Sequence, residues 1–325
     1  MGKARDYIPA LKFGHKIYPQ DLAGMVGQPV VGNIFYVDPG AGSDTANNGK
    51  SFKSAYATLS KAHDSATTLN YDVIIIASST TAGTTEAAAV TFSKSYITVI
   101  GAAAPTNISQ RSRIVFTTAA TSPQLLISGN GNRFMNVQIA TFVDSNVLVE
   151  LTGERNYFGN VHFAGIGDAT AGDDTAARCL YINDGDENVF DGCLLGLDTI
   201  MRSAANATVE MAGGVQRNTF FNCMFQMATD AETPVHVKST GTSGLDRWQR
   251  FDNCIFYNFT TNDTAKVNAV FDVSAQTATA DILMSGHNVH VGFDDWEATN
   301  SSNLWFQGYT NTANVVGIGI NPSVS

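Results

Sequence analysis

Asn218-Thr-Phe-Phe-Asn-Cys-Met-Phe225 is one of five segments of eight residues that share a single pattern. Phenylalanine holds the third position of every segment, and successive phenylalanines lie 24, 32, 30 and 31 residues apart. A period near 30 residues without a helical pattern is typical of a parallel β-solenoid. The other four segments are Asn132-Arg-Phe-Met-Asn-Val-Gln-Ile139, Asn156-Tyr-Phe-Gly-Asn-Val-His-Phe163, Asn188-Val-Phe-Asp-Gly-Cys-Leu-Leu195 and Gln249-Arg-Phe-Asp-Asn-Cys-Ile-Phe256.

Stacked coils place equivalent side chains above one another at about 4.8 Å, the spacing between strands. The fifth position is Asn in four segments and Gly in one, and both residue types accept the left-handed backbone of a tight corner. Cysteine replaces valine at the sixth position of three segments, which predicts small buried side chains and no metal ligands or disulfides. The predicted core stack is Phe134, Phe158, Phe190, Phe220 and Phe251, with Cys193, Cys223 and Cys254.

Short strand-like runs precede the segments, for example Val147-Leu-Val-Glu-Leu151, so each period is expected to hold two strands. We predict an all-β fold, a parallel β-helix over residues 33–286, with one capping helix over residues 54–67. Ser54 is the expected N-cap of that helix, and Ala55, Leu59, Ala62 and Ala66 form its apolar face. Residues 287–325 lose the period and are expected to form a C-terminal cap or a subunit contact.

The N-terminal residues 1–32 differ from the rest because basic residues outnumber acidic ones and the apolar residues are too few for a core. A disordered tail is the simpler interpretation. The functional one is an extended arm that becomes ordered on another subunit. The residues expected to anchor such an arm are Tyr7, Ile8, Leu11, Lys12, Phe13, Ile17 and Tyr18.

Composition excludes several classes of function. The chain of 325 residues has a net charge of −10, and its 19 basic residues are scattered, so we expect no nucleic-acid partner. No apolar run reaches the roughly 18 residues of a membrane span, so we expect no membrane insertion. The N-terminus lacks the apolar stretch of a signal peptide, so we expect synthesis in a cytoplasm.

Acidic residues are the candidates for catalysis, but they fall in turns, where aspartate is common anyway, and they form no column on adjacent coils. His162 is expected at an outward position, and the histidines do not align with one another. Oxygen ligands between Asp38 and Asn48 lack the spacing of a known calcium loop. We therefore predict no catalytic residues, no metal and no cofactor. The acids considered were Asp168, Asp173, Asp174, Asp184, Asp186, Glu187, Asp191 and Asp198.

The start of the body resembles that of pectate-lyase-like β-helix proteins. The resemblance lies in Phe35-Tyr-Val-Asp-Pro-Gly-Ala-Gly-Ser-Asp44, Asn48-Gly-Lys50, Ala57-Thr-Leu-Ser-Lys-Ala62 and Tyr71-Asp-Val-Ile-Ile75, where a strand, a glycine-rich loop and a helix precede the first coil. It implies a right-handed β-helix, and it covers residues 33–285. The superfamily includes polysaccharide lyases, glycoside hydrolases, phage tailspikes and phage head or tail proteins.

Within that superfamily the chain is most similar to short β-helical virion proteins of tailed phages, because it is of modest length and begins with a short arm. The resemblance implies a homotrimer in the virion that contacts the major capsid protein or another virion subunit. We predict a head decoration or cement protein that binds the capsid through its arm and is not an enzyme. The alternative is a tail spike or fibre that binds, or also cleaves, host polysaccharide, which predicts a groove with exposed aromatics and paired acids. A third hypothesis is a secreted polysaccharide lyase, and the lack of a signal-peptide pattern disfavours it.

Overall fold

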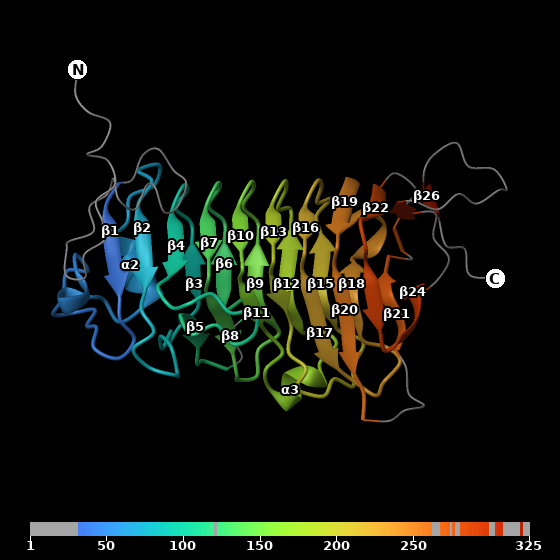
Figure 1. The fold of residues 1–325 in the computed structure, drawn as a ribbon, viewed down its shortest axis with the longest axis horizontal. Coiled ribbons are helices and arrows are strands. Elements are labelled where there is room, and N and C mark those ends of the chain that lie inside the picture. The colour runs from blue at the N-terminus through green and yellow to red at the C-terminus, as the bar shows by residue number, and fades with distance from the viewer. Residues whose placement is uncertain are drawn as a thin grey trace, which may run out of the picture.

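The chain winds into a right-handed parallel β-helix, whose coils stack into one elongated body in the computed structural model (Figure 1). The structure describes residues 32–119, 122–261, 267–273, 275–276, 280–298, 303–307 and 319–320. Strands within each sheet are parallel apart from one short terminal pair, and parallel strands joined by a crossover are almost always right-handed. The predicted fold class is therefore confirmed.

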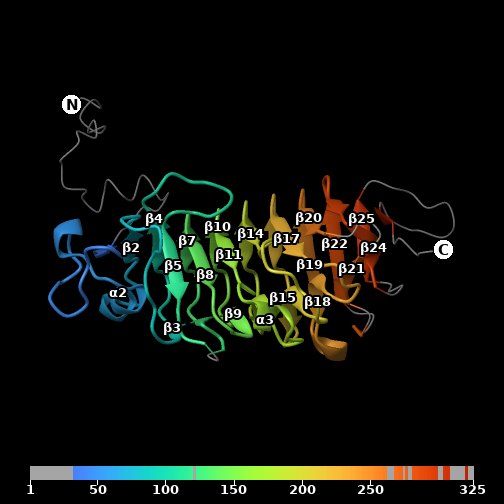
Figure 2. The ribbon, with the colours of Figure 1, turned by 90° about the horizontal axis from the view of Figure 1, so that it is seen from below.

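The described residues form three sheets along the stack, and sheet A begins before the other two (Figure 2). Sheet A contains β1 (Ile34–Val37), β2 (Val73–Ile76), β4 (Thr98–Gly101), β7 (Arg133–Met135), β10 (Tyr157–Gly159), β13 (Val189–Asp191), β16 (Thr219–Phe221), β19 (Arg247–Asp252), β22 (Ala280–Ser285), β25 (Leu304–Gln307) and β26 (Gly319–Ile320). Sheet B contains β5 (Arg113–Phe116), β8 (Gln138–Thr141), β11 (His162–Ala164), β14 (Leu194–Leu195), β17 (Met224–Ala228), β20 (Ile255–Phe259) and β23 (Val289–Val291). Sheet C contains β3 (Val90–Phe92), β6 (Leu125–Ile127), β9 (Val147–Leu151), β12 (Arg178–Asn183), β15 (Ala207–Ala212), β18 (Val235–Ser239), β21 (Val267–Asp272) and β24 (Phe293–Glu297).

A complete coil holds three strands, so the expectation of two strands per period was wrong. The eight-residue segment is itself two strands, one in sheet A and one in sheet B, with a sharp corner between them. The corner is the fifth position, where Asn136, Asn160, Asn222 and Asn253 have φ between 51° and 55° and Gly192 has φ of 62°. The left-handed backbone predicted at this position turns the chain from one sheet to the next.

The third positions of the repeat form one buried column in sheet A, which we term the Phe file. Register pairs each phenylalanine with the next, and all five side chains have no exposed surface. From Phe158 to Phe251 the rings lie nearly parallel, with centroids 4.5–4.9 Å apart. Such offset pairs add to the free energy gained from area burial alone. The file comprises Phe134, Phe158, Phe190, Phe220 and Phe251.

The cysteines of the sixth position are buried free thiols beside the Phe file. Each Sγ faces a phenylalanine carbonyl of the preceding coil, for example Cys223 and the oxygen of Phe190 at 3.4 Å. Burial raises the pKa of the Cys223 thiol. The Cys223 thiol therefore stays protonated and donates weakly to the carbonyl. This avoids an unpaired charge in the interior, which would be costly.

The first position of the repeat forms a second internal column, the Asn ladder, which the sequence analysis did not single out. Each side-chain oxygen accepts the backbone N–H of the equivalent residue one coil earlier: Asn156 N–H donates to Asn188 Oδ1 and Asn188 N–H to Asn218 Oδ1, both at 2.8 Å. The amide of Asn188 also donates to Gly153 O at 3.1 Å. These residues, together with Asn132 and Gln249, are fully or almost fully buried.

The N-terminal end of the stack carries the helix α2 (Leu59–Ser65), which is shorter than predicted (Figure 1). Residues Phe52–Ser54 form the separate 3₁₀ turn η1, and Thr58, not Ser54, caps α2 through its side chain. The helix is held from both ends by the coils. Glu86 accepts the N–H of Leu59 at 2.7 Å, and Lys94 Nζ donates to three carbonyls of the last turn.

The coil pattern continues past residue 286, so the predicted C-terminal boundary of the β-helix was too early. Strands β23, β24 and β25 pair in parallel with the preceding coil in all three sheets. Trp296 packs against Phe256 and Phe306, and Trp305 lies in β25 of sheet A, so both tryptophans belong to the stack.

Two short helices, α3 (Ala169–Gly172) and η2 (Gly241–Ser243), lie in the turns between strands. Apart from Gly32, the predicted arm lies outside the described residues.

Candidate ligand-binding pocket on sheet A

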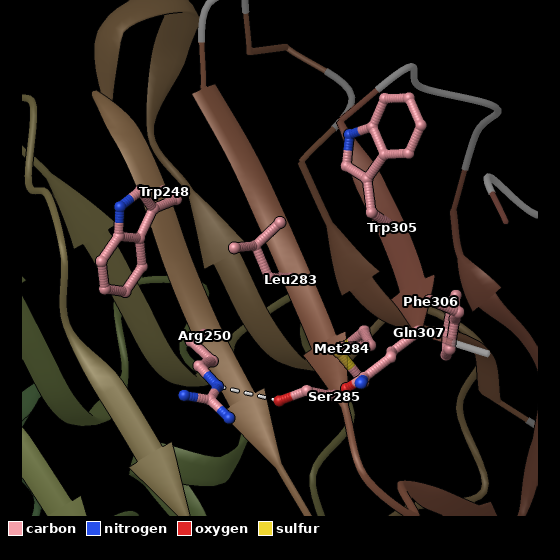
Figure 3. A pocket seen from close by; sticks show the side chains of 8 residues that line it. All are labelled: Trp248, Arg250, Leu283, Met284, Ser285, Trp305, Phe306 and Gln307. Carbon is pink, nitrogen blue, oxygen red and sulfur yellow. Dashed lines mark hydrogen bonds between the residues drawn. The ribbon is translucent and has the colours of Figure 1, made fainter. Parts of the chain in front are cut away.

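A pocket of about 410 Å³ lies on sheet A over β19, β22 and β25, near the C-terminal end of the stack (Figure 3). Strand alternation explains why Trp248, Arg250 and Leu283 reach it. Gln249, Phe251 and Ile282 are buried, so their neighbours in sequence point outward. The lining residues are Trp248, Arg250, Leu283, Met284, Ser285, Trp305, Phe306 and Gln307.

Arg250 is fixed in the pocket by three contacts. Its Nε donates to Ser285 Oγ at 2.8 Å, its Nη2 forms an ion pair with Asp252, and its guanidinium lies 5.2 Å from the centre of the Phe221 ring. A guanidinium has five N–H donors, and these two polar contacts use only two of them. Arg250 is half-exposed and its remaining N–H donors already have a fixed direction. Little side-chain conformational entropy would therefore be lost on binding.

Two tryptophans flank this centre. Figure 3 shows the indoles of Trp248 and Trp305 on either side of Leu283. The Nε1–H of Trp305 donates to Asp281 Oδ1 at 2.8 Å, which fixes the orientation of that ring. Register places Leu283 between Arg250 and Trp305, and Asp281 beside Trp248. Aromatic faces joined to a few oriented polar groups are typical of small-ligand sites.

The outer face of sheet A continues this mixture of aromatic and charged side chains towards the N-terminus. Arg133 lies over the ring of Tyr157, with 5.7 Å between the guanidinium carbon and the ring centre. The hydroxyl of Tyr157 donates to Asp191 at 3.2 Å, and burial raises the pKa of Tyr157, assisted by the charge of Asp191. Of the acids that the sequence offered as candidates for catalysis, Asp191 is the one that lies on this face.

Two of the other candidate acids fix their own turns. Asp168 caps α3 by accepting the N–H of Thr170 at 2.8 Å, and Asp174 accepts the N–H of Ala176 at 2.7 Å. Within the described residues these acids do not converge on one site, and no three His, Cys, Asp or Glu side chains gather closely enough to hold a metal ion.

A second group of acids lies at the corner before sheet A. Asp186 accepts both the backbone and the side-chain N–H of Gln216, at 2.9 and 2.8 Å. Glu187 bridges Arg155 and Arg217 of the neighbouring coils, at 2.8 and 3.1 Å. These contacts tie adjacent coils together, and exposed pairs of this kind contribute little stability.

His162 is buried, although its position was expected to be outward. It does lie on the face of β11 opposite the core residue Phe163, but other segments cover it and leave 1% of it exposed. Its Nδ1 lies 3.0 Å from Gln138 Nε2 and its Nε2 lies 3.0 Å from Gly196 O. An amide donor on one side and a carbonyl on the other fix a neutral ring protonated on Nε2.

Acid is expected to destabilise the fold through its buried histidines. Burial lowers the pKa of His162 to about 4 and, with the charge of Lys94, that of His63 to about 4, from an ordinary 6.5. The unfolded chain therefore binds more protons, so stability is full above pH 6.5 and falls as the pH drops from 6.5 to 4. Each histidine contributes a slope of at most about 1.4 kcal/mol per pH unit.

The measurement is urea-induced unfolding at a series of pH values for the wild type and His162→Gln. Glutamine does not titrate, so its slope between pH 6.5 and 4 should be shallower. Glu86, whose pKa burial raises, acts in the opposite direction but equally in both proteins. Identical slopes for the two proteins would contradict a neutral buried His162.

The pocket itself was missed by sequence reasoning. Trp248 and Arg250 alternate with buried residues of the fifth repeat, and that alternation could have marked them as outward. Trp305 offered no such signal, because it follows the last recognisable repeat.

Among the described residues, the helices are all too short or too polar to span a bilayer.

Comparison with known proteins finds similarity in structure only. No protein family model matches the sequence, and no curated protein matches it. A pectin methylesterase from Aspergillus niger is 15% identical, with a TM-score of 0.49 over 83% of this chain and 91% of its own. The pectate lyase Pel9A is 16% identical, with a TM-score of 0.45 over 81% of this chain and 78% of its own.

A third similar structure is ORF18 of Geobacillus virus E2, which is 14% identical, with a TM-score of 0.49 over 89% of this chain and 63% of its own. Identities this low concern the fold and not the activity. The fold itself follows from the parallel registers of the three sheets. By its architecture the chain is a right-handed parallel β-helix.

Proposed function

We propose that this protein is a structural component of a tailed-phage particle, a homotrimer that decorates the head and binds the capsid through its N-terminal arm. The sequence resemblance supports the place in the virion. The observation that carries the proposal is an uncovered apolar strip on sheet B, which suits contact with a neighbouring copy of the chain.

The strip lies on the outer face of β20 and β23 at the C-terminal end of sheet B. Ile255 pairs in register with Val289, and Tyr257 with Val291. Ile255, Val289 and Val291 are 45%, 48% and 49% exposed, and Phe259 extends the strip along β20. We name these five residues the sheet B strip. Contiguous exposed apolar surface on a soluble protein marks an interaction site.

The same face of sheet B is covered in the preceding coils. Gln138, His162 and Leu194 occupy the column that continues into Ile255, and each is at most 2% exposed. The chain thus shields this face over the middle coils and leaves it open over the last two. A second copy supplies the missing cover in the proposed trimer, because a closed symmetric assembly buries the same patch on every subunit.

Ile255→Asp combined with Val291→Asp is expected to convert the trimer into monomers. Both positions are exposed in the single chain, so the fold persists, whereas two carboxylates buried at the contact weaken it roughly a hundredfold. Sedimentation equilibrium measures the oligomeric state, and circular dichroism checks the fold. Ile108→Asp, at an exposed loop position, is the matched control and should remain trimeric.

Deletion of residues 1–31 separates the two parts of the proposal. The shortened protein should still form trimers but should no longer copurify with phage particles. A wild-type monomer, or a double variant that remains trimeric, would refute the role of the sheet B strip. Continued incorporation after the deletion would refute the anchoring arm.

A second candidate function is a tail spike or fibre that binds host surface polysaccharide. The pocket on sheet A favours it, because it combines Trp248 and Trp305 with the Arg250–Asp252 pair. The two functions place their contacts on different sheets, so variants of one surface leave the other intact.

A further inference from the structure

We infer that the pocket on sheet A binds a neutral oligosaccharide that lies along the stack, with a sugar ring on each of two indoles. This inference deepens the second candidate function and does not depend on the sheet B strip. It rests on the spacing of the tryptophans, the arrangement of the polar groups and the charge at the site.

The tryptophans set the direction of the ligand. Trp248 and Trp305 come from β19 and β25, with β22 between them. Two strand spacings separate these strands by about 10 Å, so a single sugar ring cannot cover both indoles. A chain of rings that crosses the three strands places its apolar C–H faces on both indoles and on Leu283 between them (Figure 3).

The polar groups match hydroxyls. Arg250 supplies N–H donors whose direction is fixed by Asp252 and Ser285, and Asp281 supplies carboxylate oxygens next to the Trp305 indole. A sugar hydroxyl both donates and accepts, so a paired cation and anion satisfy it better than either alone. Because the donors are already oriented, little conformational entropy is lost on binding.

The charge at the site selects a neutral ligand. Arg250 is the one ionised side chain among the described residues that line the pocket, and Asp252 already pairs with it, while Asp281 lies next to the Trp305 indole. The whole chain carries a net charge of −10. An acidic polysaccharide would meet repulsion here without an unpaired cation to offset it.

The test begins with a glycan array that holds neutral glucans, mannans and galactans beside uronate-containing and sialylated chains. The full-length protein is expected to bind neutral chains. Fluorescence titration with the bound oligosaccharide then compares the wild type with Trp248→Ala and Trp305→Ala, each of which should weaken binding by about tenfold or more. Tyr96→Ala, an exposed aromatic at the other end of sheet A, is the matched control and should leave the affinity unchanged.

Salt provides an independent readout of charge. Affinity for a neutral ligand should change by less than about twofold between about 0.05 and 0.5 M NaCl, because few charges meet on binding. Binding of acidic chains alone, binding of no chain on the array, or unchanged affinity in both tryptophan variants would each overturn the inference. The Ile255→Asp and Val291→Asp variant should bind the oligosaccharide normally per subunit, so failure of the trimer and failure of the pocket are distinguishable.

Discussion

Phe190→Ala is expected to lower the free energy of unfolding by about 3–5 kcal/mol. Phe190 is the middle ring of the Phe file, with the rings of Phe158 and Phe220 stacked on either side at 4.9 and 4.5 Å. Alanine removes both ring contacts and leaves a cavity that the flanking strands cannot close, because their spacing is fixed by the sheet.

Urea-induced unfolding followed by circular dichroism measures the loss. Phe142→Ala is the matched control, since Phe142 is 51% exposed and its truncation removes little buried surface. A Phe190 variant whose stability lies within about 1 kcal/mol of the control would show that the file does not carry the interior packing.

Asn188→Ala is expected to cost about 2–4 kcal/mol, although it removes only a small polar side chain. The change leaves two buried backbone groups without partners, the N–H of Asn156 and the carbonyl of Gly153. Water cannot replace the lost amide without entering the core, so the full desolvation cost of both groups appears in the folded state.

The comparison is with Asn268→Ala, at an exposed position of β21, which should change stability by less than about 0.5 kcal/mol. Hydrogen exchange of the Asn156 amide adds a local readout, because that amide should lose its protection in the Asn188 variant more than amides several coils away. Equal effects of the two substitutions would refute a structural role for the Asn ladder.

The repeat alone was enough to predict the architecture, because its chemistry is dictated by the backbone. Phenylalanine at a fixed position can stack only if the coils are parallel and in register. Asn136 and its equivalents need a left-handed corner, and Gly192 takes the same conformation in their column. Local residue types and long-range order agree here, which is why a single sequence sufficed.

The coverage of the outer faces could not be predicted from the same pattern. Alternation places His162 and Ile255 alike on the outside of sheet B, yet one is buried and the other exposed. The difference comes from irregular segments between strands, whose paths are not encoded in the repeat. The corner inside the eight-residue segment was recognised, but its consequence, a third sheet, was not.

The helix and the pocket show two further limits. Ser54 and Thr58 are both acceptable caps, and the choice of Thr58 depends on Asp44, a distant acceptor that holds its hydroxyl at 2.8 Å. Trp305 reaches the pocket only because β25 adds to sheet A beyond the last visible repeat. Both outcomes depend on contacts between residues far apart in sequence.

The Asn ladder also bears on how such a molecule can change in length during evolution. Every rung joins a coil to the next through the same pair of groups, an amide oxygen and a backbone N–H. Tandem duplication of one whole turn, for example residues 188–217, would therefore supply its own rung and its own ring for the file. The gene for this protein can thus gain or lose units of about 30 codons, each adding or removing about 4.8 Å of rod, while the surfaces at its two ends are kept.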